Sequence, residues 1–148
     1  MGRATRALVG ALLIATAAAC LTAGPAAGST AMRTRTFHAT NRSRTNHGRT
    51  ALSLQLRMSR TATRHSREMA SRGYLFHTKH VGVYLHGVTW HVWGENVGET
   101  TGSVAHLESA FMHSPVHRAN ILNRGFTHVA VGAIRRGGVL WVTVFFYG

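Results

Sequence analysis

A serine-proline pair, Ser114-Pro115, divides one apolar helical stretch into two and constrains the fold more than any other local feature. Proline lacks an amide hydrogen and clashes with the preceding turn, so a regular helix cannot continue through it. It also disfavours helical geometry at the residue before it, but it suits the first position of a new helix. The sequence therefore predicts one helix from Ser103, a good N-cap, to His113 and a second, short helix from Pro115 to Leu122.

A longer helix is predicted from Leu52 to Arg72, with Gly73 as its C-cap. Its apolar face repeats at spacings of three and four residues. The side chains on that face are Leu54, Met58, Ala62, His65 and Met69. Gly48 favours a separate short helix from Asn41 to Arg49, while the segment from Tyr74 to Val88 has no clear period and is predicted to be a loop.

The second half of the chain carries the strand signals. Apolar residues alternate from Val88 to Val92 and predict a strand that runs into Gly94-Glu95-Asn96. Two more strands, Val129 to Ile134 and Val139 to Tyr147, are separated by Arg135-Arg136-Gly137-Gly138, whose glycines suit a hairpin turn. Helices first, a strand in the middle and a hairpin last predict an α+β domain.

The first residues are predicted to be a secretory signal peptide. Two arginines precede an apolar run, Leu8 to Leu13, and small residues with a helix breaker at Pro25 follow it. The run is shorter than the roughly 20 apolar residues that a membrane span needs. We therefore expect a signal peptide at 1–28, a linker at 29–36 and one folded domain at 37–148, exported and without a transmembrane segment.

Cys20 is the sole cysteine and lies inside the expected signal peptide. The residues before it weakly resemble a lipoprotein cleavage motif but lack its usual leucine, so a lipid anchor on Cys20 is the lesser alternative to secretion. The expected domain therefore has no thiol, which excludes disulfides and cysteine chemistry.

The chain is strongly basic, with seventeen lysines and arginines, four glutamates and a formal charge of +13. A stripe along one face of the long helix is formed by Arg57, Arg60, Arg64 and Arg67. One interpretation is a solvated helix face. The other is attraction to anionic cell-wall polymers or lipid headgroups. Nucleic acid is disfavoured as a partner, because no groove with interleaved aromatics is evident and the chain is expected outside the cell.

Two of the eleven histidines stand out as candidates for chemistry. His65 lies on the apolar face of the long helix and is expected to be a hydrogen-bonded core residue. His113 and His117 have the spacing of a zinc pair, but the proline between them breaks the helix that would align them. His77 and His117 remain, and His117 in a first helical turn is expected to be neutral. Glu95, between a glycine and an asparagine, is the best-placed carboxylate.

Four segments together resemble the CAP superfamily of cysteine-rich secretory, antigen 5 and pathogenesis-related proteins, in its exported bacterial form. They are GYLFH at 73–77, GENVG at 94–98, AFMHSPVHRANIL at 110–122 and the closing VAVGAI…LWVTVFF. Asn41 and Arg44 are similar to the early Asn-x-x-Arg of that superfamily. The resemblance covers residues 37 to 148.

The resemblance implies a three-layer α-β-α sandwich with a small antiparallel sheet, and a cleft that gathers histidines and glutamates. Matched by motif, His77 and His117 are its two histidines and Glu95 its first glutamate. The second glutamate is missing, because its position falls at Ser114. Val116 is a further departure, since bacterial relatives usually have glycine there.

Members of the superfamily suggest what such a cleft holds. Some bind zinc or another divalent metal at the paired histidines, some eukaryotic members bind sterols or fatty acids, and protease activity has been proposed for others. A metal-dependent hydrolase would use His77, His117 and Glu95 as ligands and leave one position for water. Against it, no second carboxylate is placed to act as a general base.

The favoured hypothesis is an exported, non-catalytic binding module. Its cleft would hold a divalent metal or a small apolar ligand, and its basic surface would hold an anionic wall polymer or lipid headgroups. A third interpretation is purely structural: Asn96, Arg118 and Asn120 tie the GEN segment to the short helix, and His117 packs within that network.

Overall fold

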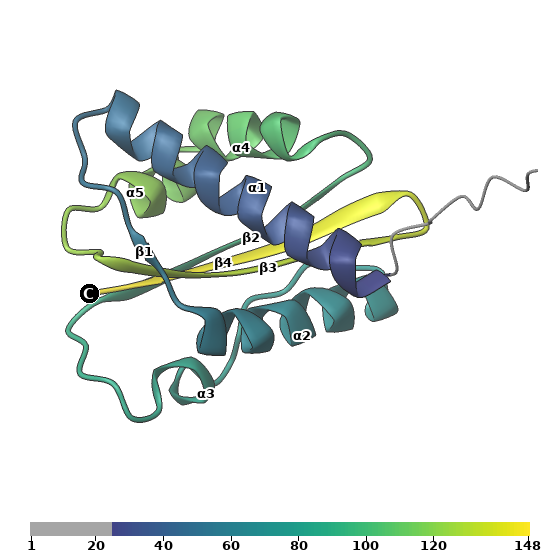
Figure 1. Cartoon of the computed structure of the whole chain (residues 1–148), viewed down its shortest axis with the longest axis horizontal. Helices are drawn as coiled ribbons and strands as arrows, with labels where there is room; N and C mark the ends of the chain where they lie inside the picture. The colour runs from purple at the N-terminus through teal and green to yellow at the C-terminus, as the bar shows by residue number, and fades with distance from the viewer. Residues whose placement is uncertain (1–24) are drawn as a thin grey trace, which may run out of the picture.

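The computed structural model describes residues 25–148, in which five helices surround a four-stranded sheet (Figure 1). In chain order the elements are α1 Pro25–Asn46, β1 Ser53–Leu54, α2 Leu56–Arg72, α3 Gly82–Leu85, β2 Trp93–Thr100, α4 Val104–His113, α5 Pro115–Leu122, β3 His128–Arg136 and β4 Val139–Tyr147. No helix within this described part is both long and apolar enough to cross a membrane.

The strand order is β1-β3-β4-β2, so β4 lies inside the sheet and β2 forms an edge. β4 pairs antiparallel with both β3 and β2. The predicted hairpin between β3 and β4 is confirmed, and Gly137 and Gly138 turn it with φ angles of 57° and 78°, which glycine adopts without steric cost. The sequence did not predict β1, whose two residues pair parallel with β3 at the other edge.

Alternation along β4 assigns its side chains to the two faces of the sheet. Leu140, Val142 and Val144 belong to the core cluster that includes Leu107 of α4 and Ile121 of α5. Phe145 and Tyr147 belong to a separate cluster with Met58 of α2 and Tyr84 of α3. Figure 1 shows α4 and α5 on one side of the sheet and α2 and α3 on the other, so the three-layer sandwich is confirmed.

Both predicted helices around the proline are confirmed. Ser103 caps α4, because its hydroxyl accepts a hydrogen bond from the amide of His106 at 3.1 Å. α5 begins at Pro115 with Ser114 at the N-cap position, although the serine side chain makes no capping bond. The predicted C-cap of α2 is also confirmed, since Gly73 has a φ of 75° and donates its amide to the Met69 carbonyl.

The predicted separate helix at 41–49 is wrong, because its residues up to Asn46 belong to the continuous helix α1. Residues 29–36, the expected linker, lie in the same helix. Pro25 suits its first turn, and although Gly28 follows in that turn, no further proline interrupts the helix before Gly48. Contacts with the sheet and core fix the helix: Ser29 donates to the Ala133 carbonyl at 3.0 Å, and Thr36 is 3% exposed. Residues 1–24 of the expected signal peptide lie outside the described part of the chain.

A buried guanidinium joins α1 to the end of α5. Arg44 is 1% exposed. It donates to four backbone carbonyls at 2.7 to 3.2 Å, those of Thr50, Ile121, Asn123 and Phe126. Burial, and then the nearby charge of Arg49, lower the pKa of Arg44 from its usual value. Because its donors are matched by carbonyls, the charge stays satisfied inside the core.

α2 approaches β3 unusually closely, through small residues. Ser66 on the helix donates to the Gly132 carbonyl at 3.2 Å and bonds the Thr143 hydroxyl at 2.9 Å. The Ser59 hydroxyl accepts from the Val131 amide at 3.1 Å. A Cβ atom at Gly132 would lie 2.2 Å from the carbonyl of Ala62, so only glycine fits there.

We therefore expect Gly132→Ala to destabilise the protein by about 3 kcal/mol or more, because a rigid helix backbone must move to admit the methyl group. The measurement is urea unfolding followed by circular dichroism. Gly82→Ala is the matched control, since nothing lies within 4 Å of its Cβ position. That variant should change stability by less than about 1 kcal/mol. Equal losses in the two variants would contradict the close approach.

Candidate functional site

The candidate site lies along β2, the edge strand of the sheet. Successive side chains of a strand point to opposite faces. Glu95 shares its parity with Val97, which packs with Met69 of α2, whereas Asn96 bonds to the α5 side. Neighbouring residues of the GEN segment therefore serve different layers, with Glu95 on the α2 side of the edge and Asn96 on the α5 side.

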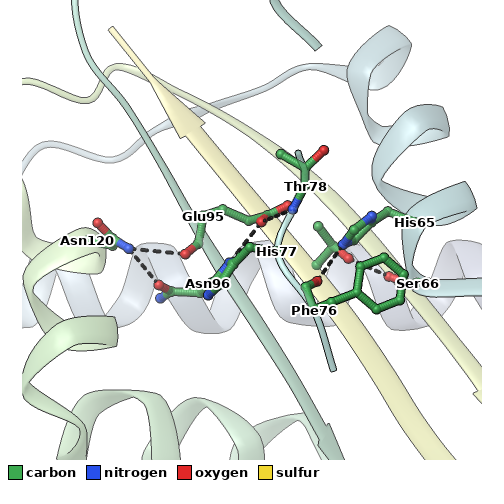
Figure 2. A network of polar contacts seen from close by, with 9 residues as sticks. His65, Ser66, Phe76, His77, Thr78, Glu95, Asn96 and Asn120 are labelled. Atoms are coloured by element: carbon green, nitrogen blue, oxygen red, sulfur yellow. Dashed lines mark hydrogen bonds and ion pairs between the residues drawn. The ribbon is translucent and has the colours of Figure 1, made fainter. Parts of the chain in front are cut away.

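Glu95 holds the segment that follows α2. Its Oε2 atom bonds the Nδ1 atom of His77 at 2.9 Å and accepts from the backbone amide of Thr78 at 2.9 Å (Figure 2). The Glu95 side chain is 1% exposed, while that of His77 is 63% exposed. The carboxylate is thus buried behind the histidine, which leaves the Nε2 atom of His77 for an outside partner.

A second histidine, on α2, holds the same segment after Gly73 from the helix side. His65 on α2 bonds the Phe76 carbonyl through Nε2 at 2.9 Å, and the two rings meet edge to face with centroids 4.9 Å apart (Figure 2). His65 is 9% exposed. This confirms the prediction of a hydrogen-bonded core histidine, and it adds that the bond positions the backbone next to His77.

His117 lies in the first turn of α5, with its ring 4.9 Å from that of Phe111. Its pKa is lowered, first by burial and then by the charge of His77. This direction favours the expected neutral imidazole, but its causes are burial and the charge of His77 and not the expected helix dipole. The segments that carry the two histidines bond to β2 from different layers, His77 through Glu95 and His117 through Asn96.

Asparagine side chains connect the GEN segment to α5. Asn96 donates to the His117 carbonyl at 3.0 Å, and Asn120 donates to the side chain of Asn96 at 2.9 Å and to the Glu95 carbonyl at 3.2 Å. The structural tie expected of these two asparagines is confirmed (Figure 2). Arg118 was expected in the same network, but it is exposed and makes no side-chain hydrogen bond among the described residues.

The two departures from the superfamily pattern lie at the start of α5. Ser114 occupies the position of the missing glutamate, and its amide closes the last turn of α4 by bonding the carbonyls of Ala110 and Phe111. Val116 is 72% exposed, so a side chain in place of the usual glycine points to solvent without a clash.

The arrangement bears on how a metal would fit. Among residues 25–148 there is no group of three His, Cys, Asp or Glu placed to hold a metal ion. Oε2 of Glu95 is engaged by His77 and Thr78, and its Oε1 is buried without a hydrogen-bond partner in the described part of the chain. Glu95 is therefore placed to orient His77 from behind, as an outer-shell carboxylate does, and not to act as a third metal ligand. Zinc binding itself stays a prediction.

Sequence reasoning missed two contributors to this site. Thr78 acts through its backbone amide, which no sequence motif marks. Tyr84 belongs to α3, in a segment predicted to be a loop, and its ring stacks on Phe145 at 4.1 Å. Burial, and then the charge of Glu95, raise the pKa of Tyr84, which favours its protonated hydroxyl.

A pocket of about 440 Å³ opens beside His77, between α2 and the segment from Tyr74 to Tyr84. His77 lines it, but neither Glu95 nor His117 does. Of the three residues expected to share a cleft, only His77 therefore lines this pocket, and Glu95 bonds His77 from the interior.

Comparisons with known proteins agree with this fold. Residues 37–146 match the family model described as the cysteine-rich secretory protein family, CAP. The chain is 29% identical over 112 residues to the uncharacterized protein YkwD of Bacillus subtilis (strain 168), which covers 72% of this chain and 43% of YkwD. The chain thus spans less than half the length of that relative.

Two solved structures carry the same fold. An extracellular SCP-domain protein of Bacillus anthracis superposes with a TM-score of 0.71 at 25% identity, covering 85% of this chain and 44% of that protein. A cysteine-rich secretory protein of Staphylococcus aureus gives a TM-score of 0.68 at 21% identity, covering 80% of this chain and 39% of that one. Because the family model matches residues 37–146, most of this chain, the chain belongs to the cysteine-rich secretory protein (CAP) family.

Proposed function

We propose that this protein is an exported, non-catalytic binding module that attaches to anionic polymers of the cell wall or to acidic lipid headgroups. The observation that carries the proposal is the uneven distribution of charge. Arg57, Arg60, Arg64 and Arg67 are all exposed along α2. Of the four glutamates, Glu95 and Glu108 are buried, Glu68 pairs with Arg72 at 2.6 Å, and Glu99 is exposed. The outward charge is therefore almost entirely positive.

A small apolar ligand is a further candidate for the same module. A second pocket of about 650 Å³ lies between α1 and α4, with Met32, Val104 and Leu140 among its lining residues. Its volume falls in the range of small-molecule sites. The buried carboxyl of Glu108 borders it, and burial raises the pKa of that group, which favours its neutral form.

The second candidate function is a metal-dependent hydrolase, and one contact favours it. The bond from Glu95 to Nδ1 of His77 fixes the ring and presents its Nε2 atom outward, as in sites where a carboxylate orients a metal-ligating or basic histidine. A zinc ion bound there would supply a Lewis acid and an activated water. His77 and His117 would hold it.

For the binding module, we expect the chain to bind vesicles of phosphatidylglycerol and phosphatidylcholine with strong salt dependence. Raising NaCl from 50 to 300 mM should weaken binding at least about tenfold, since exposed charges are screened beyond the Debye length. Co-sedimentation measures this. Replacing the four α2 arginines with glutamine should weaken binding at low salt, whereas replacing them with lysine should preserve it. Binding that ignores salt would contradict the electrostatic proposal.

For the metal site, we expect zinc to bind with micromolar or tighter affinity in a calorimetric titration. The His77→Ala, His117→Ala double variant should lose this binding, and Glu95→Gln should weaken it about 10- to 100-fold, the usual effect of removing an orienting group. Circular dichroism first establishes that each variant is folded. His113→Ala is the control, because its exposed ring bonds only within α4. A wild-type chain that binds no zinc would exclude the hydrolase.

A further inference from the structure

The pocket beside His77 has two walls of different origin. One is the outward face of α2 near its C-terminal end, and the other is the segment that returns over the helix after Gly73. Residues that matter for its chemistry are Thr61, Arg64 and Arg72 on the first wall and Phe76, Thr78 and Lys79 on the second. It lies beside the arginine stripe of α2, and it reaches His77 at its other end.

The charge of this pocket is positive. Arg64, Arg72 and Lys79 line it, against the single carboxylate of Glu68. Glu68 is engaged by Arg72 at 2.6 Å, and the Arg72 guanidinium also lies 5.2 Å from the centre of the Phe76 ring. Arg64 and Lys79 have no ion-pair partner among residues 25–148. Two cations on opposite walls are thus available to an anion between them.

We propose that this pocket binds a phosphodiester group, the anionic unit common to glycerol-phosphate wall polymers and phospholipid headgroups. The proposal rests on the proposed function and names the residues that would give it selectivity. A tetrahedral anion directs its oxygens to several sides at once, which suits a guanidinium on one wall and an ammonium on the other. Thr61 and Thr78 add hydroxyl groups to the lining.

The remaining lining suits the carbon chains on either side of a diester. Tyr74, Phe76 and Val83 present apolar surface in the same pocket, and Tyr74 and Phe76 contact each other with ring centroids 5.5 Å apart. A volume of about 440 Å³ lies within the range of small-molecule sites, which is about 300 to 1,000 Å³. One phosphodiester with a short polyol on each side is of that size class.

The pocket also brings its ligand to His77. The Nδ1 atom of this histidine is held by Glu95, so its exposed Nε2 edge borders the pocket. A ligand seated between Arg64 and Lys79 therefore changes the surroundings of His77 and of the Thr78 amide. Both groups serve as local reporters, whose signals a contact at Arg60 or Arg67, outside the pocket, would not shift.

The test is an NMR titration of the isotope-labelled chain with glycerophosphoglycerol, with gluconate as a second polyol of the same charge. Binding of glycerophosphoglycerol should shift the His77 ring and Thr78 amide signals and be at least about fivefold tighter than that of gluconate, because tetrahedral and planar anions use the two cations differently. Equal affinity for the two anions, or shifts confined to other residues, would overturn the proposal.

Charge-matched variants locate the site. Arg64→Gln with Lys79→Gln should weaken glycerophosphoglycerol binding at least about tenfold, since both removed cations contact the anion. Arg60→Gln with Arg67→Gln removes the same charge from the same helix outside the pocket and should weaken it less than about threefold, as screened long-range attraction does. Similar losses in the two double variants would overturn the pocket while leaving the basic surface as the binding feature.

The source of the phosphodiester is resolved by two further arms. Soluble poly(glycerol phosphate) and phosphatidylglycerol vesicles present the same group, and the pocket variant should lose binding to whichever one the protein uses. If vesicles and polymer bind with full salt dependence but the pocket variant matches wild type, the proposed function stands and the pocket does not. If neither polymer nor vesicle binds while glycerophosphoglycerol does, the pocket stands and surface attachment does not.

Discussion

The burial of the Arg44 guanidinium is the constraint on which the rest of the structure depends. Its four carbonyl partners belong to the chain after α1, the end of α5 and the approach to β3. A guanidinium left unpaired in that place would destabilise the fold by several kcal/mol. Helix α1 can therefore pack in this position only when these three segments supply their carbonyls. The position of α5, and with it His117, therefore depends on a residue of α1 that is more than seventy positions away.

The edge strand β2 positions the residues of the candidate site on this scaffold. Because Glu95 and Asn96 face opposite layers, one strand fixes His77 from the α2 side and the His117 backbone from the α5 side. Each histidine is thus held by β2, and neither is held by the element that carries the other. An edge strand offers this geometry because it has no further strand on its outer side to separate the layers.

Local signals in the sequence predicted the features that depend on neighbouring residues. Pro115, Ser103 and the paired glycines of the hairpin each act within a few residues, and all three predictions are confirmed. β1 and the full length of α1 were not predictable in this way. Two residues are too few for a strand pattern, and α1 is rich in Thr and Arg and lacks an amphipathic period, so tertiary contacts stabilise it.

The site shows the same division. The resemblance to the family predicted His77, Glu95 and His117 as one site, and it also suggested that Asn96 and Asn120 tie the GEN segment to α5. The motifs could not indicate that Glu95 would orient a histidine from the interior, because that depends on which face of β2 meets the loop after α2. The partners of Arg44 and the amide of Thr78 are backbone atoms. Every residue has such atoms, so a pattern of side chains does not predict which of them will be used.

The close packing of α2 on β3 has a mechanical consequence for the pocket beside His77. The glycine contact at Gly132 and the buried serine bonds make the α2 wall stiff. The opposite wall is held mainly by His65 and by one carboxylate oxygen of Glu95. The loop wall is therefore the one that moves when a guest of different size enters. Such a movement changes the length of the Glu95–His77 hydrogen bond.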